Sequence, residues 1–238
     1  MDAENDWLPD FEALSRQDLS KVKLMWVNYP HMPTGARGNI ELFADLVAFA
    51  KAHNILVIND NPYSFILNDA PESLLAADPN FSNVMELNSL SKAFNMAGWR
   101  VGMLSGSADN IAHVLKVKSN MDSGMFYGLQ QGAIAALQQP QSWFDGINAV
   151  YKERRELLWE LATRLGCTFD RQTAGMFVWA KLPEGSPDSE SFIDKVLYEQ
   201  YVFITPGTIF GSAGAGYIRF SLCVPVEQIE EAISRWNH

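Results

Sequence analysis

Five side chains of this 238-residue sequence have types and surroundings that could support chemistry on a small molecule. Lys92 follows an apolar run within NSLSKAFNMAGWR, and a lysine held in an apolar cleft can become a nucleophile toward aldehydes. Asp60 closes the run ILVIND and could face a cation, with Tyr63 three residues further on. Arg100 and Arg219 stand in the apolar segments WRVGM and YIRFSL, where a guanidinium is costly unless it reaches an anion. Taken singly, a lysine is more often a surface charge and a strand-end aspartate more often a turn or helix cap.

Short apolar runs that end in polar segments predict the elements that hold these residues. Four runs are typical of buried strands, at residues 22–27, 55–60, 84–87 and 101–104. Residues 40–53 have helical spacing, and such alternation favours an at least partly parallel sheet covered on both faces. Polar residues follow the first three runs, at positions 28–35, 60–63 and 89–92. Because ligands collect at the carboxyl ends of such strands, the sequence predicts a site at this edge of the sheet.

The pattern changes after about residue 144. Helices are expected over 109–139, with an interruption at SNMDSG, and over 144–165. Shorter elements follow: strands at 175–182, 201–204 and 217–222, and helices at 188–200 and 226–236. We therefore predict an α/β protein. Residues 1–144 would form a partial large domain with a mostly parallel sheet flanked by helices, and residues 145–238 a smaller α+β domain.

Composition excludes several classes of function. The formal net charge of −10 argues against a nucleic-acid groove and against an anionic membrane surface. No apolar run approaches the ~20 residues of a membrane helix. Two cysteines cannot form a disulfide framework, and the four histidines have no metal-ligand spacing, so we expect no metal and a reducing, cytoplasmic setting. The glycine-rich stretch 211–216 lacks the Lys-Ser/Thr ending of a phosphate loop and is interpreted as a turn.

In order along the chain, these motifs resemble a known family. NYPHMPTGA, NDNPY, SLSKAFNMAGWRVG, PGTIFG and YIRFSL are similar to segments of the fold-type I pyridoxal-phosphate enzymes, specifically class I/II aminotransferases of the aspartate aminotransferase type. The resemblance runs from about residue 20 to the C-terminus. The combination of S-x-S-K-x-x-x-x-x-G-x-R, a preceding D-x-x-Y and a late arginine is quite specific.

The resemblance implies a role for each candidate residue. Lys92 would bond to pyridoxal 5'-phosphate, be displaced by an amino-acid substrate, and then carry the proton between the substrate α-carbon and the cofactor. Asp60 would keep the pyridine nitrogen protonated, which makes the ring an electron sink. Tyr63 would donate a hydrogen bond to the ring oxygen O3′.

The remaining residues would bind anions. Ser89, with Ser91 as a second candidate, and Arg100 would hold the phosphate, and Arg219 would grip the substrate α-carboxylate with two hydrogen bonds. The implied activity is transfer of an amino group between an amino acid and a 2-oxo acid. The family also implies a homodimer.

Two departures from the family pattern leave alternatives open. Met32 stands where the family usually has an asparagine that hydrogen-bonds O3′, and a thioether cannot donate a hydrogen bond. The chain is also shorter than typical members, so we expect a C-terminal portion that lacks the N-terminal third. A pyridoxal-phosphate-dependent lyase of the same fold and a catalytically silent aminotransferase-like domain are therefore the alternatives to an aminotransferase.

Overall fold

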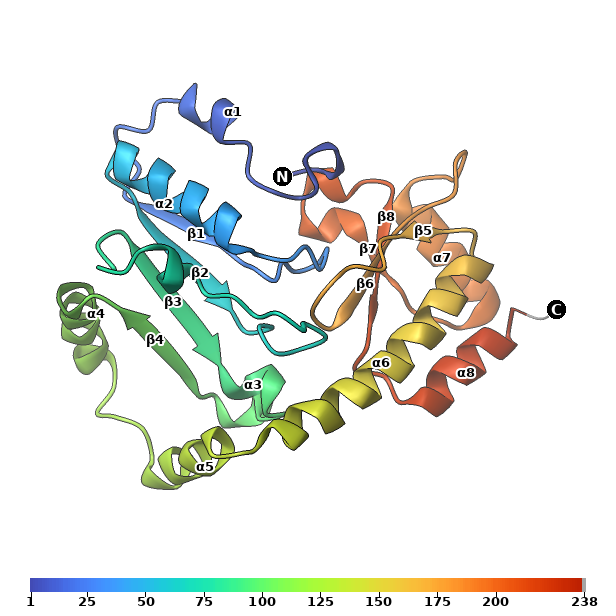
Figure 1. The fold of residues 1–238 in the computed structure, drawn as a ribbon. Coiled ribbons are helices and arrows are strands. Elements are labelled where there is room, and N and C mark those ends of the chain that lie inside the picture. Colours follow the sequence, from blue (N-terminus) through green and yellow to red (C-terminus); the bar gives the residue numbers. More distant parts are fainter. Residues whose placement is uncertain (237–238) are drawn as a thin grey trace. The chain divides into compact units, whose positions relative to one another are not determined.

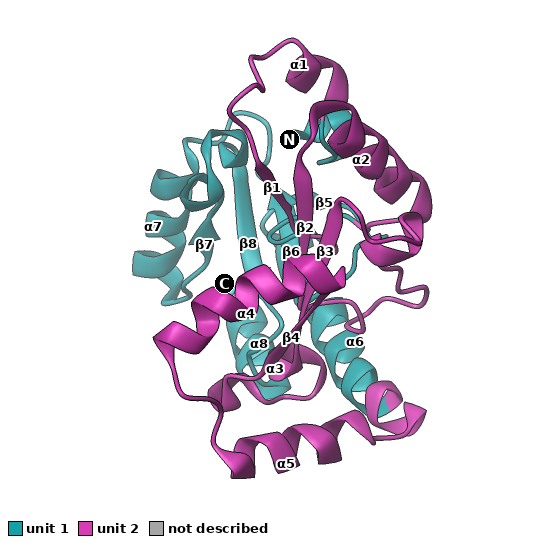
Figure 2. Cartoon of the chain, turned by 90° about the vertical axis from the view of Figure 1, so that its left-hand side faces the viewer, with its two compact units in different colours: residues 1–9, 31–36, 146–238 teal, residues 10–30, 37–145 magenta. Residues whose placement is uncertain are grey.

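The computed structural model describes residues 1–236 and divides them between two compact units (Figures 1 and 2). The unit named here the Lys92 unit comprises residues 10–30 and 37–145 and is magenta in Figure 2. The Arg219 unit comprises residues 1–9, 31–36 and the chain from 146 onward, and is teal. Each unit is described by itself.

The Lys92 unit is built on a four-stranded sheet in the order β1-β2-β3-β4 (Figure 1). The strands are β1 (Leu24–Val27), β2 (Leu56–Asn61), β3 (Val84–Ser89) and β4 (Gly102–Gly106). The first three are parallel, and β4 runs antiparallel to β3. β2 and β3 have buried residues on consecutive positions, as expected for strands covered on both faces.

Helices precede, connect and follow these strands along the chain. They are α1 (Phe11–Ser15), α2 (Ile40–His53), α3 (Leu90–Ala93), α4 (Ala108–Met121) and α5 (Tyr127–Leu137), with 3-10 turns η2 (Leu74–Ala77) and η3 (Ala97–Trp99). Asn39 begins α2 because its Oδ1 accepts a hydrogen bond from the Leu42 amide at 2.9 Å. Asn54 ends it in the left-handed conformation (φ 54°), which asparagine tolerates.

The core of this unit lies under α2 and beneath the segment that follows β3. Phe43 and Leu46 of α2 and Val57 of β2 have no exposed surface. A second cluster of Leu90, Met96 and Val101 packs on the inside of the turn that carries Lys92, together with side chains of α5. The lysine-bearing turn therefore rests on a packed apolar base.

The Arg219 unit contains an antiparallel sheet in the order β5-β6-β8-β7. Its strands are β5 (Thr168–Phe169), β6 (Phe177–Lys181), β7 (Thr205–Pro206) and β8 (Tyr217–Ser221). Its helical elements are α7 (Ser189–Gln200), α8 (Val226–Ser234) and the 3-10 turns η1 (Ala3–Asn5), η4 (Gly207–Phe210) and η5 (Ser212–Gly214). The long helix α6 (Gln141–Arg164) begins in the Lys92 unit and supplies most of its length to this one.

Two segments from the first part of the chain pack into the Arg219 unit. The Trp7 ring meets the rings of Trp179 and Tyr217 edge-on, with centroids 5.9 and 5.3 Å apart. In the 31–36 segment, the carbonyl of Gly35 accepts a hydrogen bond from the Ala174 amide at 2.9 Å. Gly35 has φ 77°, and a Cβ there would lie 2.7 Å from the side chain of Thr173, so this position requires glycine.

The predicted fold class, an α/β protein with a mostly parallel sheet followed by a smaller α+β part, is confirmed. The strand predicted at 201–204 is wrong. Tyr201 adopts the left-handed conformation (φ 55°) that ends α7, and pairing with β8 begins only at Thr205. None of the helices within residues 1–236 combines the length and apolar character needed to cross a bilayer.

Candidate active site

The parallel strands of the Lys92 unit place the predicted polar residues at one edge of the sheet. Asp60 and Asn61 end β2 in register with Leu87 and Asn88 of β3, and Ser89 ends β3 directly afterwards. The carboxyl ends of neighbouring parallel strands therefore meet at this edge, as the sequence predicted.

Asp60 has an exposed side chain at this edge, on the strand end. The surrounding protein removes part of the hydration of its carboxyl group, and this burial raises the pKa of Asp60 above its usual range. The side-chain nitrogen Nδ2 of Asn28, which follows β1, donates a hydrogen bond to the backbone carbonyl of Asp60. A carboxylate that has lost hydration is stabilised by a cation, so a protonated ring nitrogen is a fitting partner.

Tyr63 follows Asp60 after the strand has ended. Its ring is buried, with 9% of the residue exposed, and its carbonyl accepts the Ile66 amide at 3.0 Å in a tight turn. The chain thus leaves the direction of β2 at the tyrosine, two residues after the strand has ended.

Lys92 is half-buried in the short helix α3, directly after β3. Ser89 begins this helix because its Oγ accepts a hydrogen bond from the Ser91 amide at 3.1 Å. The α3 carbonyl of Ala93 accepts the indole N–H of Trp143 at 3.0 Å, which ties the helix to the start of α6. Lys92 is thus fixed one helical turn from the end of β3.

Arg100 lies just before β4, and it stands at the same edge because β4 begins where its antiparallel partner β3 ends. Gly102 pairs with Ser89, and the Leu90 amide donates to the carbonyl of Val101 at 3.1 Å. Arg100 is exposed, has φ 56°, and donates from Nη1 to the Ala97 carbonyl at 3.0 Å. Its cation therefore stands at the edge that carries the Ser89 hydroxyl, which suits a bound anion.

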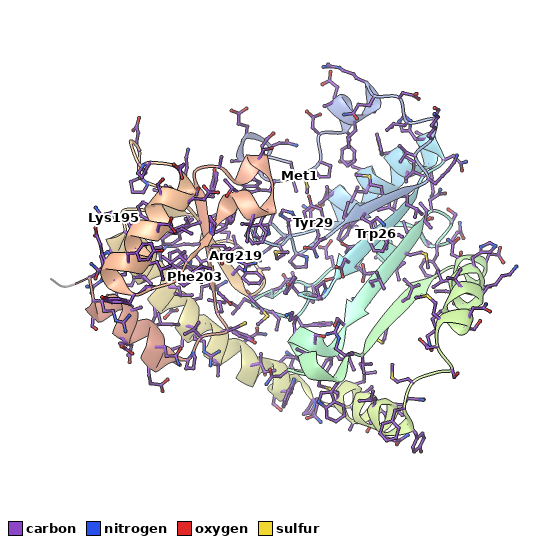
Figure 3. All side chains as sticks on the ribbon, turned by 180° about the vertical axis from the view of Figure 1, so that it is seen from behind. Met1, Trp26, Tyr29, Lys195, Phe203 and Arg219 are labelled. Atoms are coloured by element: carbon purple, nitrogen blue, oxygen red, sulfur yellow. The ribbon has the colours of Figure 1, made fainter. Side chains whose placement is uncertain are left out.

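Arg219 belongs to the other unit and lies on β8 between β6 and β7 (Figure 3). Its guanidinium carbon lies 4.2 Å from the ring centroid of Phe177 and 4.6 Å from that of Phe210. Nη1 donates to the Met32 sulfur at 3.5 Å. Two aromatic faces hold the guanidinium by cation–π attraction, and its N–H groups point along the plane, where a carboxylate binds.

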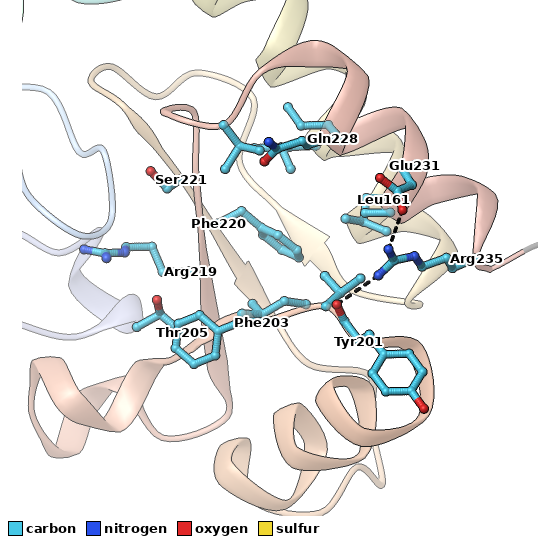
Figure 4. A pocket seen from close by; sticks show the side chains of 16 residues that line it. Leu161, Tyr201, Phe203, Thr205, Arg219, Phe220, Ser221, Gln228, Glu231 and Arg235 are labelled. Atoms are coloured by element: carbon cyan, nitrogen blue, oxygen red, sulfur yellow. Dashed lines mark hydrogen bonds and ion pairs between the residues drawn. The ribbon is translucent and has the colours of Figure 1, made fainter.

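Next to Arg219 on the strand, Phe220 points in the opposite direction, into a cavity of about 500 Å³ (Figure 4). At the far wall Arg235 donates from Nη1 to the carbonyls of Gln200 and Tyr201 at 3.0 and 2.9 Å, and Nη2 pairs with Glu231 at 2.5 Å. Arg235 therefore joins the end of α7 to α8 and serves the fold of this unit.

The structure brings six of the seven predicted site residues to one edge of the Lys92 unit: Asp60, Tyr63, Ser89, Ser91, Lys92 and Arg100. Sequence reasoning missed the two rings that bracket Arg219. It also missed Glu86, which is 3% exposed on β3 and hydrogen-bonds both neighbours of Asp60. The one available signal was a charged residue inside the apolar run VMEL. Within residues 1–236, no group of three or more His, Cys, Asp or Glu side chains is placed to hold a metal ion.

Comparison with known proteins identifies the family of the chain. The family model described as "Aminotransferase class I and II" matches residues 1–235. The LL-diaminopimelate aminotransferase of Dehalococcoides mccartyi is 43% identical over 237 residues, which cover 99% of this chain and 61% of that protein. That of Maridesulfovibrio salexigens is 40% identical over 235 residues, 98% of this chain and 60% of the relative.

Comparison with solved structures also finds proteins that are similar to this chain. The apo-BacF structure from Bacillus subtilis superimposes with a TM-score of 0.91 at 38% identity, covering 98% of this chain and 60% of that one. A single mutant of the Thermus thermophilus aspartate aminotransferase gives 0.87 at 27% identity, covering 98% and 61%. The chain thus spans about 60% of the length of these relatives. The predicted resemblance is confirmed, and the chain belongs to the class I and II aminotransferases.

Proposed function

We propose that the chain carries the lysine-bearing part of a pyridoxal-phosphate-dependent aminotransferase. One observation carries the proposal: a half-buried lysine, a carboxyl group with a raised pKa and an exposed arginine gather at the carboxyl edge of a parallel sheet. The donor set fits the cofactor, because the Asp60 carboxyl suits a pyridinium nitrogen, and Arg100 with the serine hydroxyls suits a phosphate. When bound, the cofactor supplies an electron sink for the carbanion formed at the substrate α-carbon.

The residues of this chain would do the remaining work. Lys92 would hold the cofactor at its aldehyde through Nζ and, once its amine is free, would take the proton from the substrate α-carbon and deliver it to the cofactor. Asp60 would keep the ring nitrogen protonated, and Tyr63 would donate a hydrogen bond from its hydroxyl to the ring oxygen. Ser89, Ser91 and Arg100 would bind the phosphate.

Arg219 would bind the α-carboxylate of the substrate. The planar fork of N–H groups, already fixed between Phe177 and Phe210, matches the two oxygens of a carboxylate. Since two of the relatives are named LL-diaminopimelate aminotransferase, LL-diaminopimelate with a 2-oxo acid is the first substrate pair to test. A homodimer, and the division into a cofactor-binding large domain (1–144) and a small domain (145–238), stay predictions.

The first experiment measures the bond between Lys92 and the cofactor. Adding pyridoxal phosphate should produce a visible absorption band, and borohydride should then fix the cofactor onto the peptide that contains Lys92. Lys92→Ala should abolish the band. Lys118→Ala is the matched control, because this lysine of the same unit pairs with Asp122 on the surface. A band that survives in Lys92→Ala would contradict the proposal.

A second experiment tests Arg219 and the reaction type. Arg219→Lys keeps the positive charge but loses the two-pronged geometry, so cofactor binding should be unchanged and substrate binding about 10–100-fold weaker. Loss of cofactor binding would show that Arg219 has another role. Release of ammonia or carbon dioxide from the amino acid would indicate the lyase.

The silent-domain alternative has a specific observation in its favour, because the chain spans about 60% of its relatives. It predicts no cofactor band with the wild-type chain.

A further inference from the structure

Glu86 is a buried carboxylate on β3, and the groups that donate hydrogen bonds to its side chain belong to none of the residues proposed to bind the cofactor. It is 3% exposed, and five uncharged groups donate hydrogen bonds to it. Oε1 accepts from Asn61 Nδ2 (3.4 Å), Asn88 Nδ2 (3.4 Å) and Ser73 Oγ (3.1 Å). Oε2 accepts from Asn59 Nδ2 (3.3 Å) and the Leu74 amide (2.9 Å).

Two of these donors are the strand neighbours of Asp60. Side chains alternate between the faces of a strand, so Asn59 and Asn61 point to the face opposite Asp60 and both reach Glu86. Asn59 and Asn61 are 0% and 2% exposed. The Glu86 carboxylate therefore fixes the orientation of Asp60 on β2 through hydrogen bonds on the opposite face of the strand.

The same network reaches the residues that surround Tyr63. Asn61 Nδ2 also contacts Ser64 Oγ at 3.4 Å, directly after the tyrosine. Glu86 then accepts from Ser73 and the Leu74 amide, where the loop that starts after Asn61 ends. One carboxylate thus holds both ends of the loop that carries Tyr63.

The network also crosses the sheet to the end of β1. Asn59 Oδ1 accepts the Tyr29 amide at 2.9 Å, and Asn59 Nδ2 donates to the Tyr29 carbonyl at 3.2 Å. Asn88 Nδ2 donates to the Asn61 carbonyl at 3.3 Å. The ends of β1, β2 and β3 are therefore joined through side chains that converge on Glu86.

Resting on the proposed function, we infer that Glu86 is a positioning residue for the cofactor site: it sets the geometry of Asp60 and Tyr63 without touching the cofactor. A carboxylate is required because both of its oxygens accept. A glutamine must turn its NH2 group toward one of the two donor sets, so either two or three of the five hydrogen bonds are lost.

Glu86→Gln tests this inference, with Asp78→Asn as the matched control. Asp78 is also a buried carboxylate of the Lys92 unit, 1% exposed, and accepts from Lys51, Ser82 and Asn83. Both variants exchange a buried carboxylate for an amide of similar size, but Asp78 lies before β3 begins. Loss of stability alone should affect both proteins.

The first measurement is hydrogen exchange of the backbone amides. Glu86→Gln should speed exchange in residues 59–64 about tenfold or more relative to wild type, whereas Asp78→Asn should leave these residues unchanged. Equal exchange of residues 59–64 in wild type and Glu86→Gln would overturn the inference. If Glu86→Gln fails to fold, Ser73→Ala removes a single donor and should speed exchange in the same residues by a smaller factor.

The second measurement separates positioning from a structural role. In Glu86→Gln the pyridoxal phosphate concentration that gives half of the visible band should rise about tenfold, and the pH midpoint of the band should shift; Asp78→Asn should change neither. Faster exchange with an unchanged half-saturation and midpoint would show a purely structural role and overturn the inference.

If the wild-type chain forms no band, the proposed function fails for this chain, but Glu86 can still be judged. Exchange in residues 59–64 and an NMR titration of the Asp60 carboxyl then decide whether Glu86 fixes Asp60. A shift of the Asp60 midpoint in Glu86→Gln, absent in Asp78→Asn, would support it. An unchanged midpoint would overturn it.

Discussion

His31 should make the folded chain sensitive to acid. It begins the 31–36 segment, where its amide donates to the Ala36 carbonyl at 2.8 Å and its Nδ1 lies 2.7 Å from Thr34 Oγ1. Burial lowers the pKa of His31 from 6.5 to about 4, and the positive charge of the N-terminus adds to the effect. The ring is therefore neutral in the folded chain near neutral pH.

The sign and size of the effect follow from the two pKa values. The unfolded chain binds a proton at His31 below pH 6.5, but the folded chain does so only below about pH 4, so acid favours unfolding. The contribution of His31 to the free energy of unfolding falls across this window, and it falls no further below the pKa of the folded chain. A gap of about 2.5 pH units corresponds to about 3 kcal/mol at most, of which about 2 kcal/mol is lost between pH 7.5 and pH 5.

Urea unfolding of wild type and His31→Gln at several pH values measures this loss. Glutamine can still hydrogen-bond Thr34 but does not titrate, and the carboxylates common to both proteins cancel in the difference. We expect wild type to lose about 2 kcal/mol more than His31→Gln between pH 7.5 and pH 5. Parallel pH curves for the two proteins, or an NMR midpoint of His31 near 6.5, would refute the reasoning.

Three further predictions test packing, backbone approach and surface exposure. Phe43→Ala removes a fully buried ring from α2 and should lower the free energy of unfolding by about 3–5 kcal/mol in denaturant titrations. Gly207→Ala should lower the melting temperature clearly, because its Cβ would lie 2.2 Å from the carbonyl oxygen of Gly214; Gly146→Ala, a helical position with open space around it, should raise it slightly. Trp26 lies on the edge strand β1 and is 59% exposed. Trp26→Lys should therefore reduce self-association, measured by light scattering, without lowering stability. Equal self-association of wild type and variant would contradict this prediction.

The sequence was sufficient to predict those elements whose structure is decided by the local pattern of residues. The helix predicted at 40–53 has those bounds, because an apolar face, an asparagine N-cap and a left-handed asparagine at the end all agree. The apolar runs that became β2 and β3 were recognisable because strands buried on both faces cannot contain many polar residues. The run that became β1 was equally apolar, although Leu24 and Trp26 of this strand are exposed.

The sequence was insufficient to predict features that depend on contacts between residues far apart in the chain. The apolar segment 201–204 resembles a strand, but the end of α7 fixes Tyr201 in a left-handed conformation and delays strand pairing. The sequence analysis missed Glu86 because four of the five groups that donate hydrogen bonds to it lie 12 to 27 residues away in the chain. Phe177 and Phe210 bracket Arg219 only after β6 and η4 have come together with β8.

Met32, the clearest departure from the family pattern, contacts Arg219. A thioether sulfur is a weak acceptor, so the 3.5 Å contact from Nη1 costs little to break. If Arg219 binds the substrate as proposed, a carboxylate would form stronger, charge-assisted bonds with the same N–H groups and would replace the sulfur with a net gain. The two aromatic rings keep the guanidinium plane in place during this exchange, because cation–π contacts to its faces leave the N–H edge unaffected. The substitution at position 32 therefore lacks the donor to the cofactor that the family pattern implies, but it leaves the guanidinium of Arg219 between its two aromatic rings.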